Sequence, residues 1–169
     1  MKIAALDMDG TVYVDENITD AVKEAIAAWR DAGNLAVSAT GKSIANARGT
    51  LEPFGVELDY HVLYNGTVLT DGNYSVLHEE HLAADTVRAI TERFTGKPLN
   101  IYITGLTGPD KIVWDGLSGQ ESSMVTGAQP VELGDVTKRD TVLMSLWIPG
   151  DAALRQEVDE WVRAYFDVE

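Results

Sequence analysis

The segment Ile3-Ala4-Ala5-Leu6-Asp7-Met8-Asp9-Gly10-Thr11, near the N-terminus, decides which fold the chain adopts. Its first four apolar residues predict a short buried strand, and Asp7 and Asp9 follow at the carboxyl end of that strand. Gly10 predicts that the chain turns there and leaves backbone N–H groups free. Open α/β sheets place their chemistry at the carboxyl ends of the strands. The segment therefore indicates a site on such a sheet.

The two carboxylates of this segment carry like charges. If the strand continues through them, Asp7 and Asp9 point to the same side and repel each other. A cation between them, or a proton on one of them, removes this repulsion. Either remedy indicates a functional site, and the alternative is an acidic turn after a strand, with a structural role only.

Composition limits the classes of protein to which the chain can belong. Its 169 residues suffice for one ordinary domain or two small ones, and 45% hydrophobic with 24% charged residues is typical of a soluble globular protein. No apolar run is long enough to span a membrane, and Asp7 comes too early for a signal peptide, so we expect a cytoplasmic location. Without cysteine there is no disulfide and no thiolate metal site.

The charge of the chain limits its partners. Thirteen basic and 27 acidic residues give a formal net charge of −14. This charge repels nucleic acids and anionic membranes, so we expect neither as a partner. It also repels anionic small molecules, so a phosphate site here needs compensation from a metal, backbone amides or a lysine.

Strands and helices alternate in the first part of the chain. The pattern predicts strands at 3–6, 35–39 and 61–64, with a helix capped by Thr19 and stopped by Gly33, and another capped by Ser43. This order implies right-handed crossovers and a parallel sheet, whose continuous apolar strands we expect to be buried on both faces. The loops after the three strands should then face the same edge.

From Thr67 onward the pattern changes. Two short strands flank Asp71-Gly72-Asn73, which is a hairpin signal. The remaining elements are a helix capped by Asp85, paired strands at 99–104 and 111–114, a strand at 141–148 and a last helix capped by Asp151. We therefore predict an α/β part at 1–66, a connecting hairpin at 67–80 and a small α+β unit at 81–169.

Three motifs follow the three predicted parallel strands. They are Asp7-Met8-Asp9-Gly10-Thr11, Thr40-Gly41-Lys42 and Asn65-Gly66. In this strand context they resemble the haloacid dehalogenase (HAD) superfamily of phosphatases, and most closely its Cof-type branch. The resemblance implies a Rossmann-like parallel-sheet core, present here in part, with an α+β cap domain inserted after the third core strand.

The resemblance also implies roles for single residues. Asp7 is the expected nucleophile and forms an aspartyl-phosphate, while Asp9 protonates the leaving alcohol and then deprotonates the attacking water. The expected cofactor is Mg²⁺, held by the Asp7 carboxylate and the Asp9 carbonyl. The residues expected to bind the phosphate of the substrate are Gly10, Thr11, Thr40, Gly41, Lys42 and Asn65.

Each motif also has a simpler interpretation. Thr40 can cap the helix that follows it, and Lys42 can be a surface charge, since the family more often has arginine there. Asn65-Gly66 is by itself a strong turn signal. The three histidines of the chain do not show the spacing of metal ligands.

The sequence departs from the family pattern after the predicted cap. The family also uses a lysine from a later core helix and a further acidic motif after a fourth core strand, and neither is evident here. Gly134-Asp135 with Asp140 has a suitable spacing, but a poor strand precedes it and a strand, not a helix, follows. Losing one preorganised charge-stabilising group costs about 10²–10³ in rate.

The same departure affects the sheet. In the family the first strand is central, so without the later segment residues 3–6 form an open apolar edge. We therefore expect the chain to self-associate, to pair with a separate chain that completes the core, or to be a truncated product. The function that we expect is an Mg²⁺-dependent phosphatase of small phosphorylated metabolites, such as sugar phosphates, or the N-terminal part of one. The alternative is a catalytically silent phosphometabolite-binding or assembly module.

Overall fold

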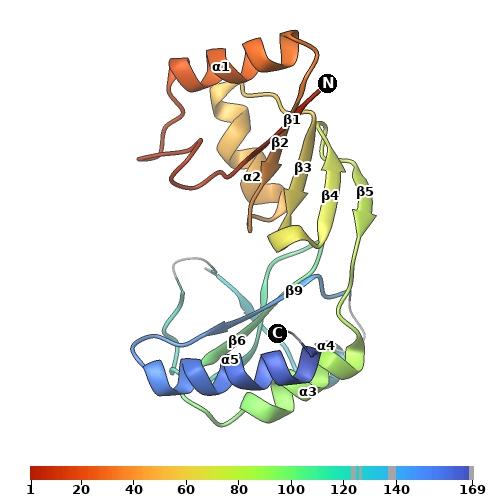
Figure 1. The fold of residues 1–169 in the computed structure, drawn as a ribbon. Coiled ribbons are helices and arrows are strands. Elements are labelled where there is room, and N and C mark those ends of the chain that lie inside the picture. The colour runs from red at the N-terminus through yellow and green to blue at the C-terminus, as the bar shows by residue number, and fades with distance from the viewer. Residues whose placement is uncertain (123–124, 126, 137–139, 168–169) are drawn as a thin grey trace. The chain divides into compact units, whose positions relative to one another are not determined.

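The computed structural model describes residues 1–122, 125, 127–136 and 140–167. The chain divides into two compact units, Met1–Leu82 and Ala83–Glu169 (Figure 1). Each unit has its own sheet and its own hydrophobic core. In the described part of the chain, no helix is long and apolar enough to cross a membrane.

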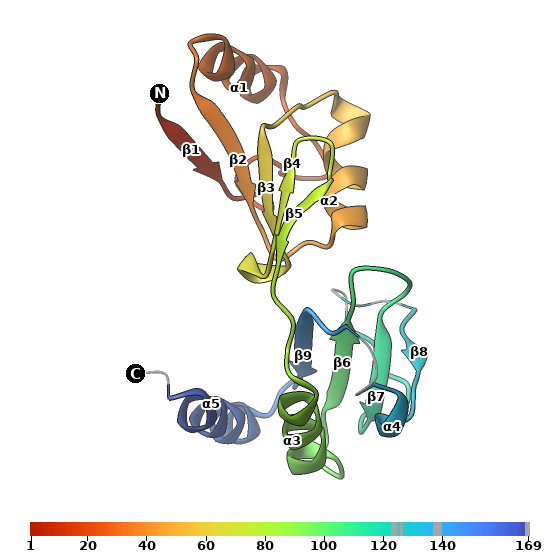
Figure 2. The ribbon, with the colours of Figure 1, turned by 90° about the vertical axis from the view of Figure 1, so that its right-hand side faces the viewer.

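The first unit is built on one five-stranded sheet, whose strands lie in sequence order (Figure 2). The first three strands are parallel, and the last two are antiparallel to their neighbours. The strands are β1 (Ile3–Leu6), β2 (Leu35–Ala39), β3 (Tyr60–Leu63), β4 (Val68–Asp71) and β5 (Val76–Glu79). The predicted parallel α/β sheet is confirmed, and the hairpin after it belongs to the same sheet.

The two crossover helices of this sheet begin where the sequence predicts. In front of α1 (Asp20–Asp31), Thr19 accepts a hydrogen bond from the Val22 N–H at 3.4 Å. In front of α2 (Ile44–Leu51), Ser43 accepts one from the Asn46 N–H at 3.2 Å. The short 3₁₀ helix η1 (Glu52–Phe54) follows α2. The capping predictions for Thr19 and Ser43 are confirmed.

Both helices pack on the same face of the sheet. Ile26 of α1 and Leu51 of α2 share one core cluster with Ala36 of β2, and Leu6 packs against it. Side chains alternate along a strand, so Ile3 and Ala5 lie on the opposite face, which no helix of the fully described first unit covers.

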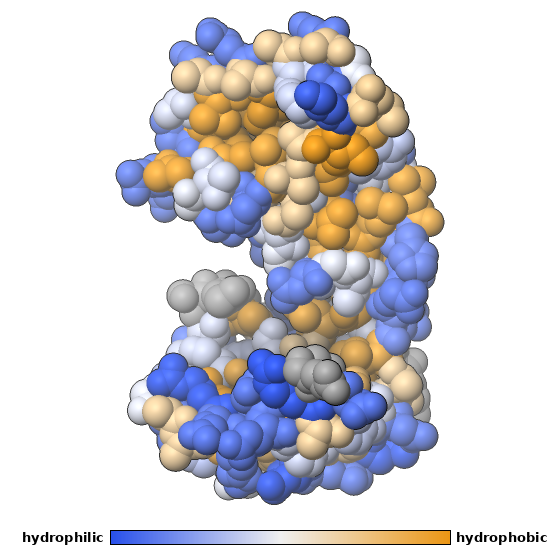
Figure 3. All heavy atoms as spheres, viewed as in Figure 1, coloured by the Kyte–Doolittle hydropathy of each residue, from blue (hydrophilic) through white to orange (hydrophobic). Residues whose placement is uncertain are grey.

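The expectation that β1 is buried is therefore wrong. The strand pairs only with β2, and the side chain of Ile3 is 64% exposed. A parallel strand is buried when it has a neighbouring strand on each side and a covering layer on each face. β1 has a neighbouring strand on one side only and a covering layer on one face only. Hydrophobic residues gather over the strands of this unit in Figure 3. The expected open edge is present.

The turn between β3 and β4 is the 3₁₀ helix η2 (Tyr64–Gly66). Asn65 adopts a left-handed conformation there, with φ of 58°. Asparagine tolerates this region better than most residues. The Asn65-Gly66 pair thus forms the turn that its sequence predicts.

The second unit combines a four-stranded sheet, in the order β8-β7-β6-β9, with helices. Its strands are β6 (Asn100–Thr104), β7 (Lys111–Asp115), β8 (Gln129–Pro130) and β9 (Leu143–Trp147), and its helices are α3 (Ala84–Phe94), α4 (Leu133–Val136) and α5 (Ala152–Phe166). The antiparallel pairing of β6 with β7 and the cap of α5 by Asp151 confirm two predictions.

Two sequence features of the second unit, the predicted cap of α3 and the Gly134-Asp135 segment, need separate comment. Asp85 does not cap α3, because the helix already starts at Ala84 and the carboxylate of Asp85 pairs instead with Arg88 at 2.8 Å. Gly134 and Asp135 lie in the short helix α4. Residues 137–139, between them and Asp140, lie outside the described residues.

Candidate active site

The first loop of the candidate site is wound around one backbone carbonyl. Met8 is fully buried, and its carbonyl oxygen accepts hydrogen bonds from the N–H groups of Thr11, Val12 and Tyr13 at 3.3, 3.1 and 2.8 Å. Asp7 and Asp9, on either side of it, are exposed. The loop therefore anchors its middle residue in the core and presents both carboxylates on the surface.

The orientation of the Asp7 carboxylate is fixed by its own loop. The Thr11 hydroxyl donates a hydrogen bond to Asp7 Oδ2 at 3.2 Å. Gly10, with φ of 79°, makes the tight turn between the two residues. One oxygen of Asp7 is thus held by Thr11, whereas Oδ1 accepts no hydrogen bond from the described residues and is open to a ligand.

The second loop follows β2 and begins with Thr40. The Thr40 hydroxyl accepts a hydrogen bond from the Lys42 N–H at 3.3 Å. Ser43 caps α2, so the simpler interpretation of Thr40 as the helix cap is excluded. Thr40 instead stabilises the turn that carries Gly41 and Lys42.

The third loop lies directly against the second. The Asn65 N–H donates to the Thr40 carbonyl at 3.3 Å, and the Tyr64 N–H donates to the Lys42 carbonyl at 3.1 Å. A Cβ on Gly41 would lie 2.6 Å from Asn65 Oδ1, so the two residues are in close approach. The predicted meeting of the second and third loops is thus observed.

The side chain of Lys42 connects the second loop with the first. Its Nζ lies 2.9 Å from Asp9 Oδ1, and the side chain is 19% exposed. The same Nζ lies 5.9 Å from the centre of the Tyr13 ring. Lys42 is therefore not a free surface charge, and it neutralises part of the charge of the acidic loop.

The structure brings all the predicted site residues into the three loops that follow the carboxyl ends of β1, β2 and β3. Contacts link Asp7 with Thr11, Asp9 with Lys42, Lys42 with Thr40, and Asn65 with Thr40. No group of three or more acidic or histidine residues that could hold a metal ion occurs among the residues described. Asp7 and Asp9 therefore stand as a pair, without a third acidic ligand from these residues.

Two tyrosines support the site and were not identified from the sequence. Tyr64 is 2% exposed, and its hydroxyl accepts a hydrogen bond from the Ile44 N–H at 3.2 Å, which ties the third loop to the start of α2. Tyr13 lies beside the ammonium of Lys42. Neither tyrosine stands in a pattern that separates it from an ordinary core aromatic residue.

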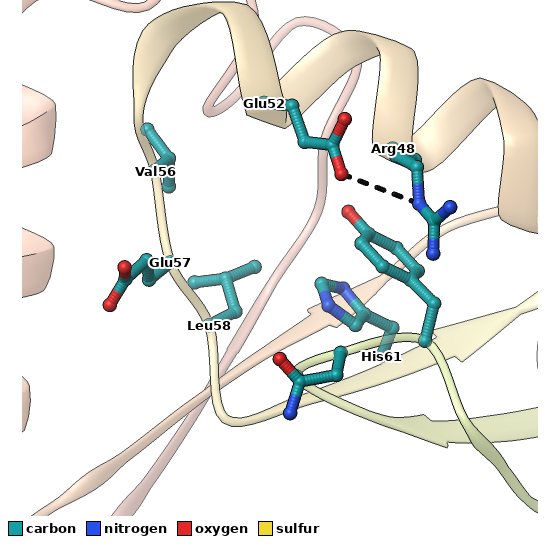
Figure 4. Close-up of a pocket in the computed structure, with 9 residues that line it drawn as sticks. Arg48, Glu52, Val56, Glu57, Leu58 and His61 are labelled. Carbon is teal, nitrogen blue, oxygen red and sulfur yellow. Dashed lines mark ion pairs between the residues drawn. The ribbon is translucent and has the colours of Figure 1, made fainter.

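A pocket of about 240 Å³ lies elsewhere in the first unit, between the end of α2, the loop before β3 and the β4–β5 turn (Figure 4). His61 lies at its base and stacks on Tyr74, with ring centres 4.3 Å apart. Arg48 lies over Tyr74 at 4.8 Å and pairs with Glu52 at 3.4 Å. The residues that line this pocket are Arg48, Glu52, Val56, Glu57, Leu58, His61, Gly72, Asn73 and Tyr74.

The surroundings of the histidine in this pocket disfavour its charged form. His61 Nδ1 lies 2.9 Å from the Ser38 hydroxyl oxygen, and Nε2 has no hydrogen-bond partner of ordinary geometry in the described part of the chain. Burial lowers the pKa of His61, and the nearby Gly72 backbone and Asp71 carboxylate oppose this only in part. His61 lies near the start of β3 and Asn65 after its end, so the pocket is separate from the candidate site.

The family of the chain follows from a comparison with known families. The model of the haloacid dehalogenase-like hydrolases matches residues 4–116, which contain all three loops of the candidate site. The match covers more than half of the chain. The chain belongs to this family, as its motifs predict, and to its Cof-type branch.

Similar proteins agree with this assignment. The chain is 29% identical over 89 residues to the 5-amino-6-(5-phospho-D-ribitylamino)uracil phosphatase YcsE of Bacillus subtilis, a match over 52% of this chain and 35% of that enzyme. A sugar phosphatase of HAD subclass IIB has a TM-score of 0.73 at 18% identity, and a haloacid dehalogenase-like hydrolase from B. subtilis has one of 0.77 at 13% identity. These solved structures show a shared fold.

The chain is shorter than the proteins that it resembles. The comparison with the subclass IIB sugar phosphatase covers 97% of this chain but 63% of that one, and the comparison with the B. subtilis hydrolase covers 97% and 67%. More than a third of the sugar phosphatase therefore has no counterpart in these 169 residues.

Proposed function

We propose that the candidate site performs phosphoryl transfer and that the chain is a phosphatase of small phosphorylated metabolites, or the N-terminal part of one. The observation that carries this proposal is the contact between Lys42 and Asp9, which joins the loops after β1 and β2 and places a cation on the carboxylate two residues after Asp7. A phosphoryl group bound there meets both a carboxylate nucleophile and groups that neutralise its charge.

Asp7 is the nucleophile of the proposed reaction. Its free carboxylate oxygen forms a bond to phosphorus while the bond from phosphorus to the alcohol oxygen of the substrate breaks, which gives an aspartyl-phosphate. Thr11 holds the other oxygen of Asp7 and so fixes the direction of attack. Water then attacks the phosphorus, inorganic phosphate leaves, and the Asp7 carboxylate is restored.

Asp9 is the proposed acid and base. In the first step it gives a proton to the leaving alcohol oxygen, and in the second it takes one from the attacking water. Asp9 lies two residues from Asp7, and both are exposed on either side of the buried Met8. The Thr40 turn, with the N–H of Gly41, and the ammonium of Lys42 would bind the phosphoryl oxygens.

The cofactor that we propose is Mg²⁺. The site fits it in donor type, because Asp7 offers a carboxylate and the carbonyl of Asp9 accepts no hydrogen bond within the described residues, whereas the carbonyl of Met8 accepts three. Mg²⁺ prefers such oxygen ligands and often uses only one or two carboxylates, together with water. When bound, it supplies charge neutralisation of the transferring oxygens.

The proposed substrates are small phosphorylated metabolites, sugar phosphates among them. The similar B. subtilis enzyme is by its name a phosphatase of a phosphoribityl compound, and one of the similar structures is that of a sugar phosphatase. A charge of −14 on this chain requires local compensation at any phosphate site, and Lys42 provides it.

The proposal is tested by hydrolysis of 4-nitrophenyl phosphate in the presence and absence of Mg²⁺. The chain should release 4-nitrophenol only with Mg²⁺, and Asp7→Asn should abolish the reaction. Equal rates in the wild type and in Asp7→Asn would contradict the proposal. Binding of Mg²⁺ without turnover would favour the second candidate function, a silent phosphometabolite-binding or assembly module. The absence of a third acidic ligand among the described residues supports this second candidate.

We also propose that an additional polypeptide completes the sheet of the first unit. The occupant of the open edge and the uncovered face would supply a strand parallel to β1 and an apolar helix over Ile3, Ala5 and their neighbours. A second copy meets these needs less well, because edge-to-edge pairing leaves the face uncovered, face-to-face packing leaves the edge unpaired, and each copy carries a charge of −14. The similar subclass IIB sugar phosphatase has further chain length beyond the 63% that the match covers.

Light scattering and hydrogen exchange of this chain alone test that proposal. We expect no dimer of fixed stoichiometry, and we expect the β1 amides to exchange faster than those of β2, which is paired on both sides. A stable dimer that protects β1 as well as β2 would show that a second copy is the occupant and would overturn the proposal.

A further inference from the structure

Lys42 is held in place at its backbone and at its ammonium group. Its N–H donates to the Thr40 hydroxyl, its carbonyl accepts from the Tyr64 N–H, and its ammonium pairs with Asp9 at 2.9 Å. The same ammonium lies 5.9 Å from the centre of the Tyr13 ring. The ammonium is therefore directed at the acidic loop by the fold of two other loops.

The Lys42 ammonium lies where it would repel a divalent cation bound at the same acidic loop. Two carboxylates one residue apart repel each other unless a cation lies near them. In this structure Lys42 supplies that charge through Asp9. A divalent cation at the same acidic loop would take over this role and would be repelled by the ammonium that remains beside it.

We propose that Lys42 competes with Mg²⁺ for the acidic loop and is withdrawn from Asp9 by the phosphate of the substrate. The inference rests on the proposed function and adds a coupling between its two ligands. An incoming phosphoryl oxygen offers the ammonium a second anionic partner. When Lys42 turns to it, Asp9 is released and the metal meets less repulsion.

The coupling between Mg²⁺ binding and phosphate binding must be reciprocal. If phosphate strengthens the binding of Mg²⁺, then Mg²⁺ strengthens the binding of phosphate by the same factor. The metal and the substrate would thus be taken up together, and Lys42 acts as a positioning residue for Asp9. A lysine with only a structural role would affect the two ligands in the same direction.

Titrations with MgCl₂ and with inorganic phosphate, separately and together, test the coupling without turnover. In Lys42→Met, Mg²⁺ alone should bind about fivefold or more tightly than in the wild type, phosphate should bind about fivefold or more weakly, and the mutual enhancement should be smaller than in the wild type. Lys42→Arg keeps the charge and should keep the enhancement. Chemical shifts of the amides of residues 7–11 report binding in each case.

A matched control removes the same charge at another ion pair. Lys23 pairs with Asp20 at 2.6 Å on α1, so Lys23→Met changes the net charge equally but leaves the three loops unaltered. Its affinities should equal those of the wild type. The inference is overturned if Lys42→Met binds Mg²⁺ no more tightly than Lys23→Met does, if both ligands weaken together, or if the wild type binds neither ligand.

The inference and the proposed function fail in different ways. Opposite changes in Mg²⁺ and phosphate affinity without any hydrolysis would support the role of Lys42 and would remove the proposed catalysis. Hydrolysis that depends on Asp7, together with unchanged affinities in Lys42→Met, would support the proposed function and overturn the role of Lys42.

Discussion

Asn65 Oδ1 occupies the space next to Gly41 that a side chain on Gly41 would need. A Cβ there would lie 2.6 Å from this oxygen, although the two residues are on different loops and 24 positions apart in the chain. The backbone hydrogen bond from Asn65 to Thr40 fixes the same contact. The loops after β2 and β3 are therefore fitted to each other at these two residues.

Gly41→Ala should disturb the site more than it disturbs the fold. The obstacle is the end of an exposed side chain, which can move, so we expect the free energy of unfolding to fall by less than about 1 kcal/mol. In the Asn65→Gly background the same substitution should cost nothing, because the obstacle is gone and glycine accepts the positive φ of 58°. Denaturant unfolding of the wild type, the two single variants and the double variant gives the coupling energy between Gly41 and Asn65. An equal cost of Gly41→Ala in both backgrounds would show that the contact is absent.

Two glycines of the first unit should respond to alanine in opposite ways. A Cβ on Gly72 would meet the carbonyl oxygen of Leu58, which is backbone, so we expect Gly72→Ala to cost about 1–3 kcal/mol or more. Gly49 lies in α2 with open space around it, so Gly49→Ala should stabilise by up to about 1 kcal/mol. Urea denaturation measures both, and a stabilising Gly72→Ala would contradict the β4–β5 turn described.

The uncovered face of the sheet predicts that Ile3 contributes little to the stability of this chain. Ile3→Lys should change the free energy of unfolding by less than about 0.5 kcal/mol and should reduce any non-specific association through the exposed apolar face. Leu51→Ala, at a side chain that is 1% exposed, should cost about 2–5 kcal/mol. Thermal unfolding and light scattering make the comparison, and a large loss in Ile3→Lys would mean that β1 is covered in solution.

The buried histidine predicts a loss of stability in acid. Burial lowers the pKa of His61 below its unfolded value of about 6.5, so the unfolded state takes up the proton first. The contribution of neutral His61 to the free energy of unfolding is complete above pH 6.5, and it is lost as the pH falls from there through the lowered pKa of the folded state. Unfolding free energies at pH 7.5 and 5.5 should therefore differ less in His61→Phe than in the wild type.

A control for that experiment uses an exposed histidine. His78→Gln, on β5, keeps His61 and should show the same loss between the two pH values as the wild type. If His61→Phe loses as much stability on acidification as the wild type does, proton uptake by His61 makes no contribution. The His61→Phe substitution also removes the hydrogen bond to Ser38. The comparison uses the change in unfolding free energy between the two pH values, so this loss does not affect it.

Local signals in the sequence were sufficient for much of the first unit. The apolar run at Leu35–Ala39 and the caps Thr19 and Ser43 follow from short-range pattern and hydrogen bonding, and all are found. The parallel order of β1, β2 and β3 follows from the alternation of elements, so the meeting of the three loops could be predicted as well.

What could not be predicted depends on contacts far apart in the chain. The exposure of β1 follows from which neighbours it has, and its four apolar residues give no sign of that. The pairing of Lys42 with Asp9, and of Tyr64 with the start of α2, requires the relative position of loops in space. Asp85 is of a residue type that is common at helix caps, but the cap position of α3 is occupied by Ala83.

The central claim is that Asp7 becomes covalently phosphorylated. The most direct measurement is the mass of the peptide that contains Asp7 after the chain has reacted with 4-nitrophenyl phosphate and Mg²⁺ and has been quenched in acid. The account predicts one added phosphoryl group on that peptide, and none in Asp7→Asn. Release of 4-nitrophenol without this adduct in the wild type, or an adduct on another residue, would contradict it.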